Sequence, residues 1–228
     1  MTSRLMGQLK RCFFTLGENG SEPITVVFKL FCRSLPKTTS NFIDLCTGRY
    51  GGHERHCSYK NSLVTRIIAP EYIVQLGKID RRSSKTISGL DDLLDKQEYA
   101  EKAETIREKV RLKHGGYLCV IAGKDSPFEF FITLTDLRKY RNNELKDYLA
   151  IGELEKPSVD TLNDWLQQRE VDRADKPVKE CRIVRCGELV PKENTSTRKL
   201  NLVARKDNKK KASGQNKDSV NAYSALFG

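Results

Sequence analysis

The sequence predicts a mainly β, antiparallel domain that carries two amphipathic helices. Short runs of β-branched, aliphatic and aromatic residues recur along the chain, separated by Gly, Pro, Asn and Ser, as in strands joined by turns. Two windows that begin at Pro36 and Pro157 instead carry apolar residues at helical spacing. With 228 residues the chain is long enough to bury a core without disulfides or metal ions.

The first half of the domain is expected to hold a hairpin, a helix and a second strand pair. Residues 9–16 and 24–31 form the hairpin, because Asn19-Gly20 tolerates the positive φ of a tight turn. Pro36 lies in the first turn of the helix, Ser34 or Leu35 caps it, and Gly48 ends it. The second pair covers residues 63–68 and 72–74, with Ala69-Pro70-Glu71 as the break.

The second half of the domain is expected to hold four more strands and one helix. The strands cover residues 116–122, 129–134, 148–154 and 178–186. The helix begins at Pro157, and Leu162, Trp165 and Leu166 line its apolar face.

Residues 80–114 form an insertion whose composition favours a helix. Residues 92–113 lack Gly and Pro and are rich in helix-forming residues. Asp92 with Lys96 and Glu98 with Lys102 stand four apart in the order that favours ion pairs. The apolar edge is thin, so the sequence predicts a mostly exposed helix over or beside the barrel. It is either a solvated addition or a surface for a partner.

The net charge of +11 is concentrated towards one end of the sequence. Residues 191–228 carry nine Lys or Arg against three Asp or Glu, and too few apolar residues for a core. This basic tail is expected to attract an acidic protein surface or, without sequence specificity, nucleic acid. The alternative is a solubilising extension with no partner.

No run of residues suggests a membrane span or a signal peptide. We therefore expect a cytoplasmic or nuclear protein that is not secreted, in which the seven cysteines are reduced thiols.

Two histidines and two cysteines lie near one another in the sequence. Zinc binding by Cys46, His53, His56 and Cys57 is possible in principle, but their spacing is not an established ligand arrangement. Cys46 is more simply a core residue of the first helix. The favoured interpretation is an ordinary loop, with no metal and no cofactor.

Arg66 interrupts an apolar, strand-like run, so its guanidinium must reach solvent or meet a partner in a pocket. The stretch around it, Y-K-N-S-L-V-T-R-I-I-A-P-E-Y-I-V-Q-L-G at residues 59–77, resembles the catalytic strand pair of the cyclophilins, which are peptidyl-prolyl isomerases. Residues 26–48, V-V-F-K-L-F-C-R-S-L-P-K-T-T-S-N-F-I-D-L-C-T-G, resemble the family's second strand and first helix. Later strand-like runs follow in the family's order, so the resemblance covers about residues 9–189.

The resemblance implies a closed, eight-stranded antiparallel β-barrel capped by two α-helices. The cyclophilin-like domain would cover residues 9–189, including the helical insertion at 80–114. Residues 1–8 would form an N-terminal extension, and residues 190–228 the basic low-complexity tail.

The resemblance also implies where a proline-containing peptide or protein would bind. In cyclophilins an arginine donates to the prolyl amide as it twists, which helps to cross a barrier of about 18–20 kcal/mol. Arg66 is the residue of this sequence that matches that arginine, and Gln75 matches its supporting amide. The matching walls of the proline pocket are Tyr72, Ile73 and Phe131. No covalent step and no metal is involved.

Several matching positions differ from the family pattern. Thr65 replaces a histidine, Glu129 a glutamine, Ala122 an asparagine that binds the peptide backbone, and Tyr148 a late histidine. No tryptophan stands near residue 143, and Leu76-Gly77-Lys78 replaces Gly-Gly-Asp. One extra residue between Arg66 and Tyr72 is expected to displace a member of the site.

The departures suggest how the arginine is occupied. A Glu129 carboxylate in place of the amide is expected to pair with Arg66 and make it a poorer donor to substrate.

Two functions follow from the sequence. The favoured one is a peptide-binding or scaffold protein with weak or lost isomerase activity, held in a larger intracellular assembly partly through residues 191–228. The alternative is an active isomerase that acts in protein folding. Divergent cyclophilins occur in spliceosomes, cilia and other cytoskeletal structures, so those places are candidate locations.

Overall fold

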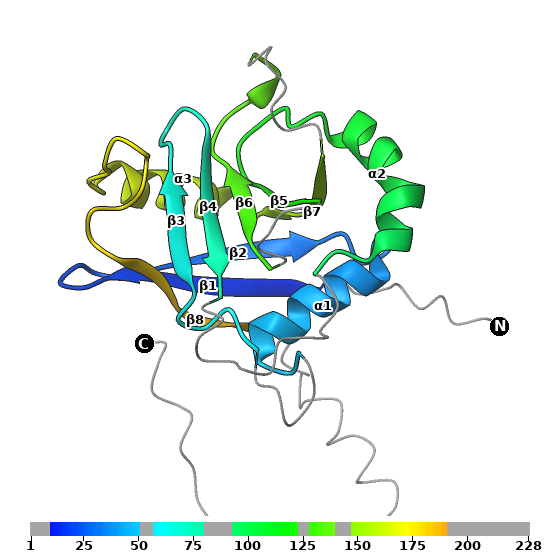
Figure 1. Ribbon diagram of the computed structural model, residues 1–228, viewed down its shortest axis with the longest axis horizontal. Coiled ribbons are helices and arrows are strands. Elements are labelled where there is room, and N and C mark those ends of the chain that lie inside the picture. The colour runs from blue at the N-terminus through cyan, green and yellow to red at the C-terminus, as the bar shows by residue number, and fades with distance from the viewer. Residues whose placement is uncertain (1–9, 51–56, 80–92, 123–127, 140–146, 191–228) are drawn as a thin grey trace, which may run out of the picture. The chain divides into compact units, whose positions relative to one another are not determined.

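Eight strands in the described part of the chain close into an antiparallel β-barrel, as Figure 1 shows. The computed structural model describes residues 10–50, 57–79, 93–122, 128–139 and 147–190. Around the barrel the strands follow the order β1-β2-β7-β5-β6-β4-β3-β8, and every neighbouring pair runs antiparallel. The predicted mainly β, closed eight-stranded barrel is confirmed.

The elements fall in the predicted order. They are β1 Arg11–Glu18, β2 Ile24–Leu30, α1 Pro36–Thr47, β3 Leu63–Ile67, β4 Ile73–Lys78, α2 Lys96–Val110, β5 Tyr117–Ile121, β6 Phe130–Thr133, a 3₁₀ turn at Leu137–Lys139, β7 Tyr148–Leu154, α3 Lys156–Gln167 and β8 Cys181–Leu189. β7 has the predicted bounds, whereas β4 and β8 extend beyond the predicted ends. The extension at residues 1–8 and the tail at 191–228 lie outside the described residues.

Aromatic side chains from the strands and from α1 fill the interior of the barrel. Phe14, Phe28, Phe42, Tyr59 and Phe130 are all almost fully buried. The ring centroids of Phe14 and Phe28 lie 4.8 Å apart, and those of Tyr59 and Phe130 lie 5.0 Å apart in an edge-to-face arrangement. Because Phe42 comes from α1, this cluster fixes that helix to the barrel as well as the strands to one another.

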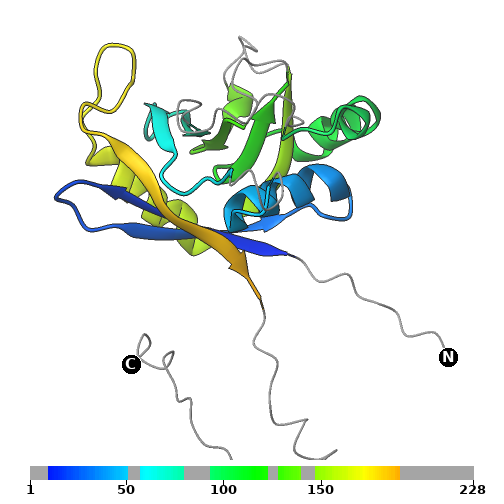
Figure 2. The same ribbon diagram turned by 60° about the horizontal axis from the view of Figure 1, so that its bottom comes forward.

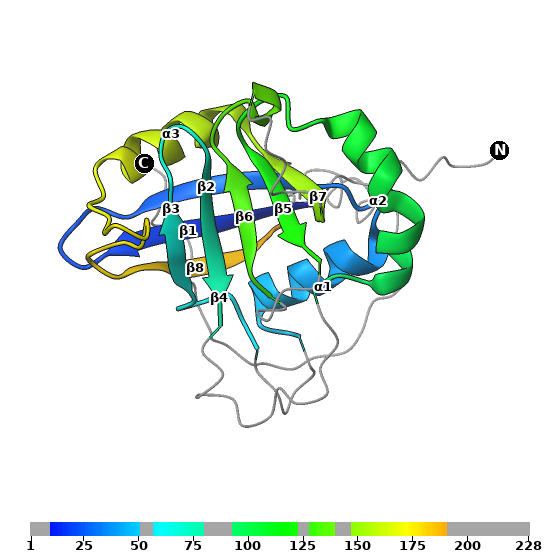
Figure 3. The same ribbon diagram turned by 45° about the horizontal axis from the view of Figure 1, so that its top comes forward.

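Figure 3 shows α1 and α3 at opposite ends of the barrel and α2 along its side. α1 has a proline in its first turn and ends at Gly48, which adopts the left-handed conformation with φ of 73°. α3 also has a proline in its first turn and buries Leu162, Trp165 and Leu166. The predictions for both helices are confirmed.

The cap of α1 comes from another helix. Leu35 is the N-cap residue, but its side chain accepts no hydrogen bond. Instead, Glu98 of α2 accepts hydrogen bonds from the backbone N–H groups of Lys37 (2.7 Å) and Thr38 (2.9 Å). The predicted ion pair of Glu98 with Lys102 is therefore wrong. A helix N-terminus offers unpaired N–H donors and the positive end of the helix dipole. The Glu98 carboxylate therefore binds the N-terminus of α1 and not Lys102 on its own helix.

α2 is attached to the barrel more firmly than its composition suggested. Ala103, Ile106 and Val110 are buried, and the helix packs against β7. Its outer face is exposed, as predicted. The insertion therefore adds a wall to the outside of the barrel over β7.

Among the described helices, none combines the length and the apolar character that crossing a bilayer requires.

Candidate functional site

Three strands bring the central residues of the predicted site together. Arg66 of β3 lies opposite Gln75 of β4, and Gln75 lies opposite Phe131 of β6. Residues directly opposite on neighbouring strands project from the same face of a sheet, so these three side chains share the outer face of the barrel. The sequence prediction of Arg66, Gln75 and Phe131 as one group agrees with this register.

A β-bulge at Thr65 accompanies this register. Val64 pairs with Leu76 and Arg66 pairs with Gln75, so Thr65 has no opposite residue of its own. The extra residue in the β3–β4 connection therefore leaves Arg66 opposite Gln75, so neither of these two is the member of the site that was expected to be displaced. The turn takes up the added length and closes with hydrogen bonds between Ile68 and Ile73 and between Tyr72 and Ile68.

Arg66 binds Asp175, and the predicted pair with Glu129 is wrong. The Nε and Nη2 atoms of Arg66 donate to Oδ2 of Asp175 at 3.1 and 2.8 Å. Oε1 of Glu129 instead accepts from the hydroxyl of Thr65 at 2.5 Å. The strand order explains the difference: β3 borders β4 and β8, so the loop before β8 reaches Arg66 directly, while Glu129 meets Thr65 first.

The loop that carries Asp175 is held by its own hydrogen bonds. Asp175 has a φ of 60° and donates its N–H to the carbonyl of Asp172 at 3.0 Å. The side chain of Asp172 accepts from the N–H groups of Ala174 and Lys176. The carbonyl of Asp175 also accepts from the N–H of Ile67 in β3 at 2.8 Å. Figure 2 shows this loop beside β3, so the partner of Arg66 is positioned by backbone contacts.

Two of the three predicted walls of the proline pocket are buried in this structure. Phe131 is 0% exposed and Ile73 is 4% exposed, whereas Tyr72 is partly exposed. Cys119 of β5 lies opposite Phe131 and is also fully buried, which raises its pKa well above the ordinary value. Neither Phe131 nor Ile73 offers surface to a proline ring in this conformation.

Ala122 and Tyr148 lie at the same ends of two paired strands. The N–H of Ala122 donates to the carbonyl of Asp147 at 2.8 Å. Burial raises the pKa of Tyr148 to about 12, and Arg107 and Glu104 of α2 also act on it. The wall formed by β7 is therefore flanked by the insertion helix. Ala122 has no side-chain amide with which to bind a peptide backbone.

A sequence model described as cyclophilin type peptidyl-prolyl cis-trans isomerase/CLD matches residues 15–188. The chain belongs to this family. Among curated relatives, peptidyl-prolyl cis-trans isomerase 9 of Caenorhabditis briggsae is 30% identical over 213 residues, which are 88% of this chain and 61% of that protein. The protein of the same name from Caenorhabditis elegans is 30% identical over 200 residues, 82% and 58% of the two chains. The cyclophilin described here thus spans about 60% of the length of these relatives.

Sequence reasoning missed Asp175 as the partner of Arg66. The D-R-A-D-K-P run at residues 172–177 signals a turn, since Asp and Pro favour turns. That signal places a loop but says nothing about which strand the loop touches. The 109 residues between Arg66 and Asp175 explain why no local rule paired them.

Of the four residues that could in principle bind zinc, the structure describes only the two cysteines. Cys46 and Cys57 are buried, and burial raises the pKa of the Cys57 thiol to about 11. His53 and His56 lie outside the described residues. Within the described ranges, no three His, Cys, Asp or Glu side chains gather in a way that suits a metal ion.

Proposed function

We propose that this cyclophilin binds proline-containing segments of proteins and isomerises them weakly or not at all, so that it acts mainly as a binding or scaffold protein. The proposal rests on one observation: the catalytic candidate Arg66 is engaged by Asp175 through two of its N–H donors. A prolyl amide nitrogen is a weak acceptor and must compete with a carboxylate for the guanidinium. The closed positions of Phe131 and Ile73 add to this cost.

The altered positions around Arg66 support the same proposal. Thr65 and Glu129 are occupied with each other, so neither is free to orient Arg66 towards a substrate. Ala122 lacks the amide that would hold a peptide backbone. Each lost hydrogen bond to a bound peptide costs about 0.5–1.5 kcal/mol, and several losses together weaken the bound state strongly.

The second candidate is an active isomerase, and one observation favours it. Arg66, Gln75 and Phe131 keep a shared face, and the Arg66 side chain is 46% exposed and reachable from solvent. Its partner Asp175 is 35% exposed, and ion pairs at such exposure contribute only about 0–1 kcal/mol. A substrate that binds well enough would displace Asp175.

A proline-peptide isomerisation assay on four proteins separates the two candidates. The wild type should turn over slowly, Asp175→Asn should raise turnover about two- to fivefold by releasing the guanidinium, and Arg66→Ala should remove the remainder. Glu180→Gln makes the same charge change at an exposed pair with Arg182 and should have no effect. Wild-type turnover equal to that of ordinary cyclophilins, lost in Arg66→Ala and unchanged in Asp175→Asn, would refute the scaffold proposal.

Membership of a larger intracellular assembly is the second part of the proposal. It is supported by the composition of residues 191–228, whose nine basic and three acidic residues suit an acidic protein surface. Affinity purification of the full chain and of a chain ending at Val190 tests it. Partners should be lost with the tail in a salt-dependent manner. Retention of every partner by the truncated chain would show that the tail does not bind them.

A further inference from the structure

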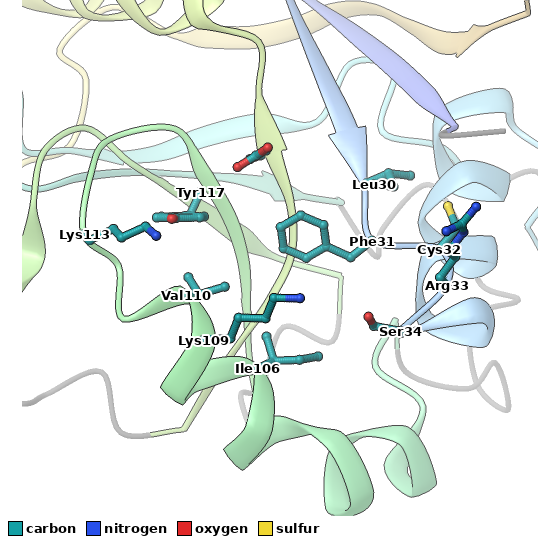
Figure 4. A pocket seen from close by; sticks show the side chains of 11 residues that line it. Leu30, Phe31, Cys32, Arg33, Ser34, Ile106, Lys109, Val110, Lys113 and Tyr117 are labelled. Carbon is teal, nitrogen blue, oxygen red and sulfur yellow. The ribbon is translucent and has the colours of Figure 1, made fainter. Parts of the chain in front are cut away.

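A cavity of about 530 Å³ lies between α2 and the outside of the barrel, away from Arg66. Figure 4 shows it from close by. Its apolar lining comes from two sides: Phe31 and Tyr117 belong to the barrel side, and Ile106 and Val110 belong to α2. The volume falls within the range of about 300–1,000 Å³ that is usual for ligand sites.

The shape of this α2 cavity is fixed by the ends of the elements around it. β2 ends at Leu30, and the following residues turn into α1, where the carbonyl of Phe31 accepts from the N–H groups of Ser34 and Leu35. α2 ends with two residues in the left-handed region, Arg111 with φ of 51° and Leu112 with φ of 44°. They turn the chain back towards β5. The cavity is therefore preformed by hydrogen-bonded segments.

Three cationic side chains surround the apolar lining. They are Arg33, Lys109 and Lys113, and Glu153 is the single carboxylate among the lining residues. None of the three cations forms an ion pair within the part of the chain that the structure describes. In Figure 4 the lysines reach into the gap beside Phe31 and Tyr117.

The arrangement on α2 follows from helical spacing. Lys109 and Val110 follow Ile106 by three and four residues within α2, whereas Lys113 lies beyond the end of the helix, after Arg111 and Leu112. Ile106, Lys109 and Val110 thus share the face of the insertion helix that adjoins the cavity, and the turn after the helix brings Lys113 to the same cavity. The few apolar residues of α2 therefore have two roles: they pack the helix against the barrel, and two of them, Ile106 and Val110, also line this cavity.

We propose that the α2 cavity binds an acidic segment of a partner protein by taking up one large apolar side chain while flanking carboxylates meet Lys109, Lys113 and Arg33. The apolar lining matches the side chain, and the excess of positive charge matches the carboxylates. The chain's own basic tail has the wrong sign for this site. A second copy, with a net charge of +11, is also repelled.

Fluorescence anisotropy with a defined probe tests this proposal. The probe is a fluorescein-labelled peptide with one phenylalanine between two pairs of aspartates, and the control probe replaces the aspartates with asparagines. The acidic probe should bind saturably and more weakly as salt rises, whereas the asparagine probe should not bind.

Charge reversal at the end of α2 and in the turn after it provides one of two matched variants. The double variant Lys109→Glu, Lys113→Glu should weaken binding by about tenfold or more, because two attractive contacts become repulsive. The double variant Lys96→Glu, Lys102→Glu makes the same charge change at exposed positions of α2 that do not line the cavity. It should weaken binding by no more than about twofold, through the change of net charge alone.

A chemical readout locates the probe. Cys32 is partly exposed and lines the cavity, so bound probe should slow its alkylation, measured by peptide mass spectrometry. Equal loss of binding in the two double variants, absence of saturable binding, or binding that leaves Cys32 unprotected would each overturn the proposal. Loss of probe binding in Arg66→Ala would place the probe on the other face and overturn it as well. None of these outcomes depends on isomerase activity.

Discussion

Replacing Glu98 should destabilise the domain far more than its position on a mostly exposed helix suggests. Its carboxylate accepts two backbone hydrogen bonds, from Lys37 and Thr38, and the residue is only 8% exposed. A hydrogen bond to a charged group contributes about 1.5–3 kcal/mol. Lys37 is exposed, so water can reach part of the broken site. Glu98→Ala should therefore lower the free energy of unfolding by about 3 kcal/mol, near the lower end of the sum.

Glu98→Gln refines this expectation. The amide keeps one acceptor oxygen but presents an NH₂ group to the second backbone donor, so about 2 kcal/mol should be lost. Thermal unfolding followed by circular dichroism and by the fluorescence of Trp165, the single tryptophan, measures both variants. For a domain of this size each kcal/mol corresponds to about 2–4 °C, so Glu98→Ala should melt about 6–12 °C lower.

The control for this experiment is on the same helix. Glu101 is exposed and bonds to Gln97 one turn earlier, so Glu101→Gln should shift the midpoint by less than about 2 °C. If Glu98→Ala melts within the same small interval as Glu101→Gln, the reasoning is wrong: α1 would then not depend on α2 for its cap.

Glu98→Ala should also weaken the docking of α2, and it should therefore reduce binding of the acidic peptide probe at the α2 cavity.

Two further predictions concern a buried ion pair and the thiols. Arg169 pairs with Glu18, and both side chains are less than 10% exposed, at 7% and 9%. Glu18→Gln leaves a buried cation without its partner and should cost about 3 kcal/mol in urea unfolding, whereas Glu180→Gln at an exposed pair should cost less than about 1 kcal/mol. Equal losses would contradict this reasoning. At pH 8, iodoacetamide should label the partly exposed Cys32 well before Cys57, because the pKa of Cys57 is raised to about 11 by burial and the reactive form is the thiolate. Labelling of Cys57 should rise with pH as its thiolate forms, and equal labelling at pH 8 would contradict the burial argument.

The sequence predicted the barrel because its signals are local. Alternating and continuous apolar runs mark strands wherever they occur, and prolines and glycines mark the ends of helices. Pro36 and Gly48 bound α1 as expected. The register of Arg66 with Gln75 and Phe131 also agrees with the prediction. The family resemblance implied the order of these strands, and Arg66 stays opposite Gln75 although Thr65 forms a bulge.

The partners of the charged side chains could not be read from the sequence. Glu98 has a suitable lysine four residues away, yet it binds a helix terminus that lies 60 and 61 residues away in sequence. Glu129, just before β6, was the acid expected to pair with Arg66, but Arg66 instead pairs with Asp175 from a loop. Closure of the barrel decides both cases, because it determines which loop borders which strand. Local spacing rules contain no information about that closure.

The insertion helix connects the two surfaces discussed above. One part of α2 places Glu104 and Arg107 where they act on Tyr148, at the edge of the predicted proline site. Another part places Lys109 beside the α2 cavity. Because both sets of residues stand on one helix, a ligand that shifts α2 at the cavity should change the environment of Tyr148. Such coupling requires differential binding to two positions of the helix. A shift in the titration of Tyr148 on probe binding would reveal it, and an unchanged titration would show that the two surfaces are independent.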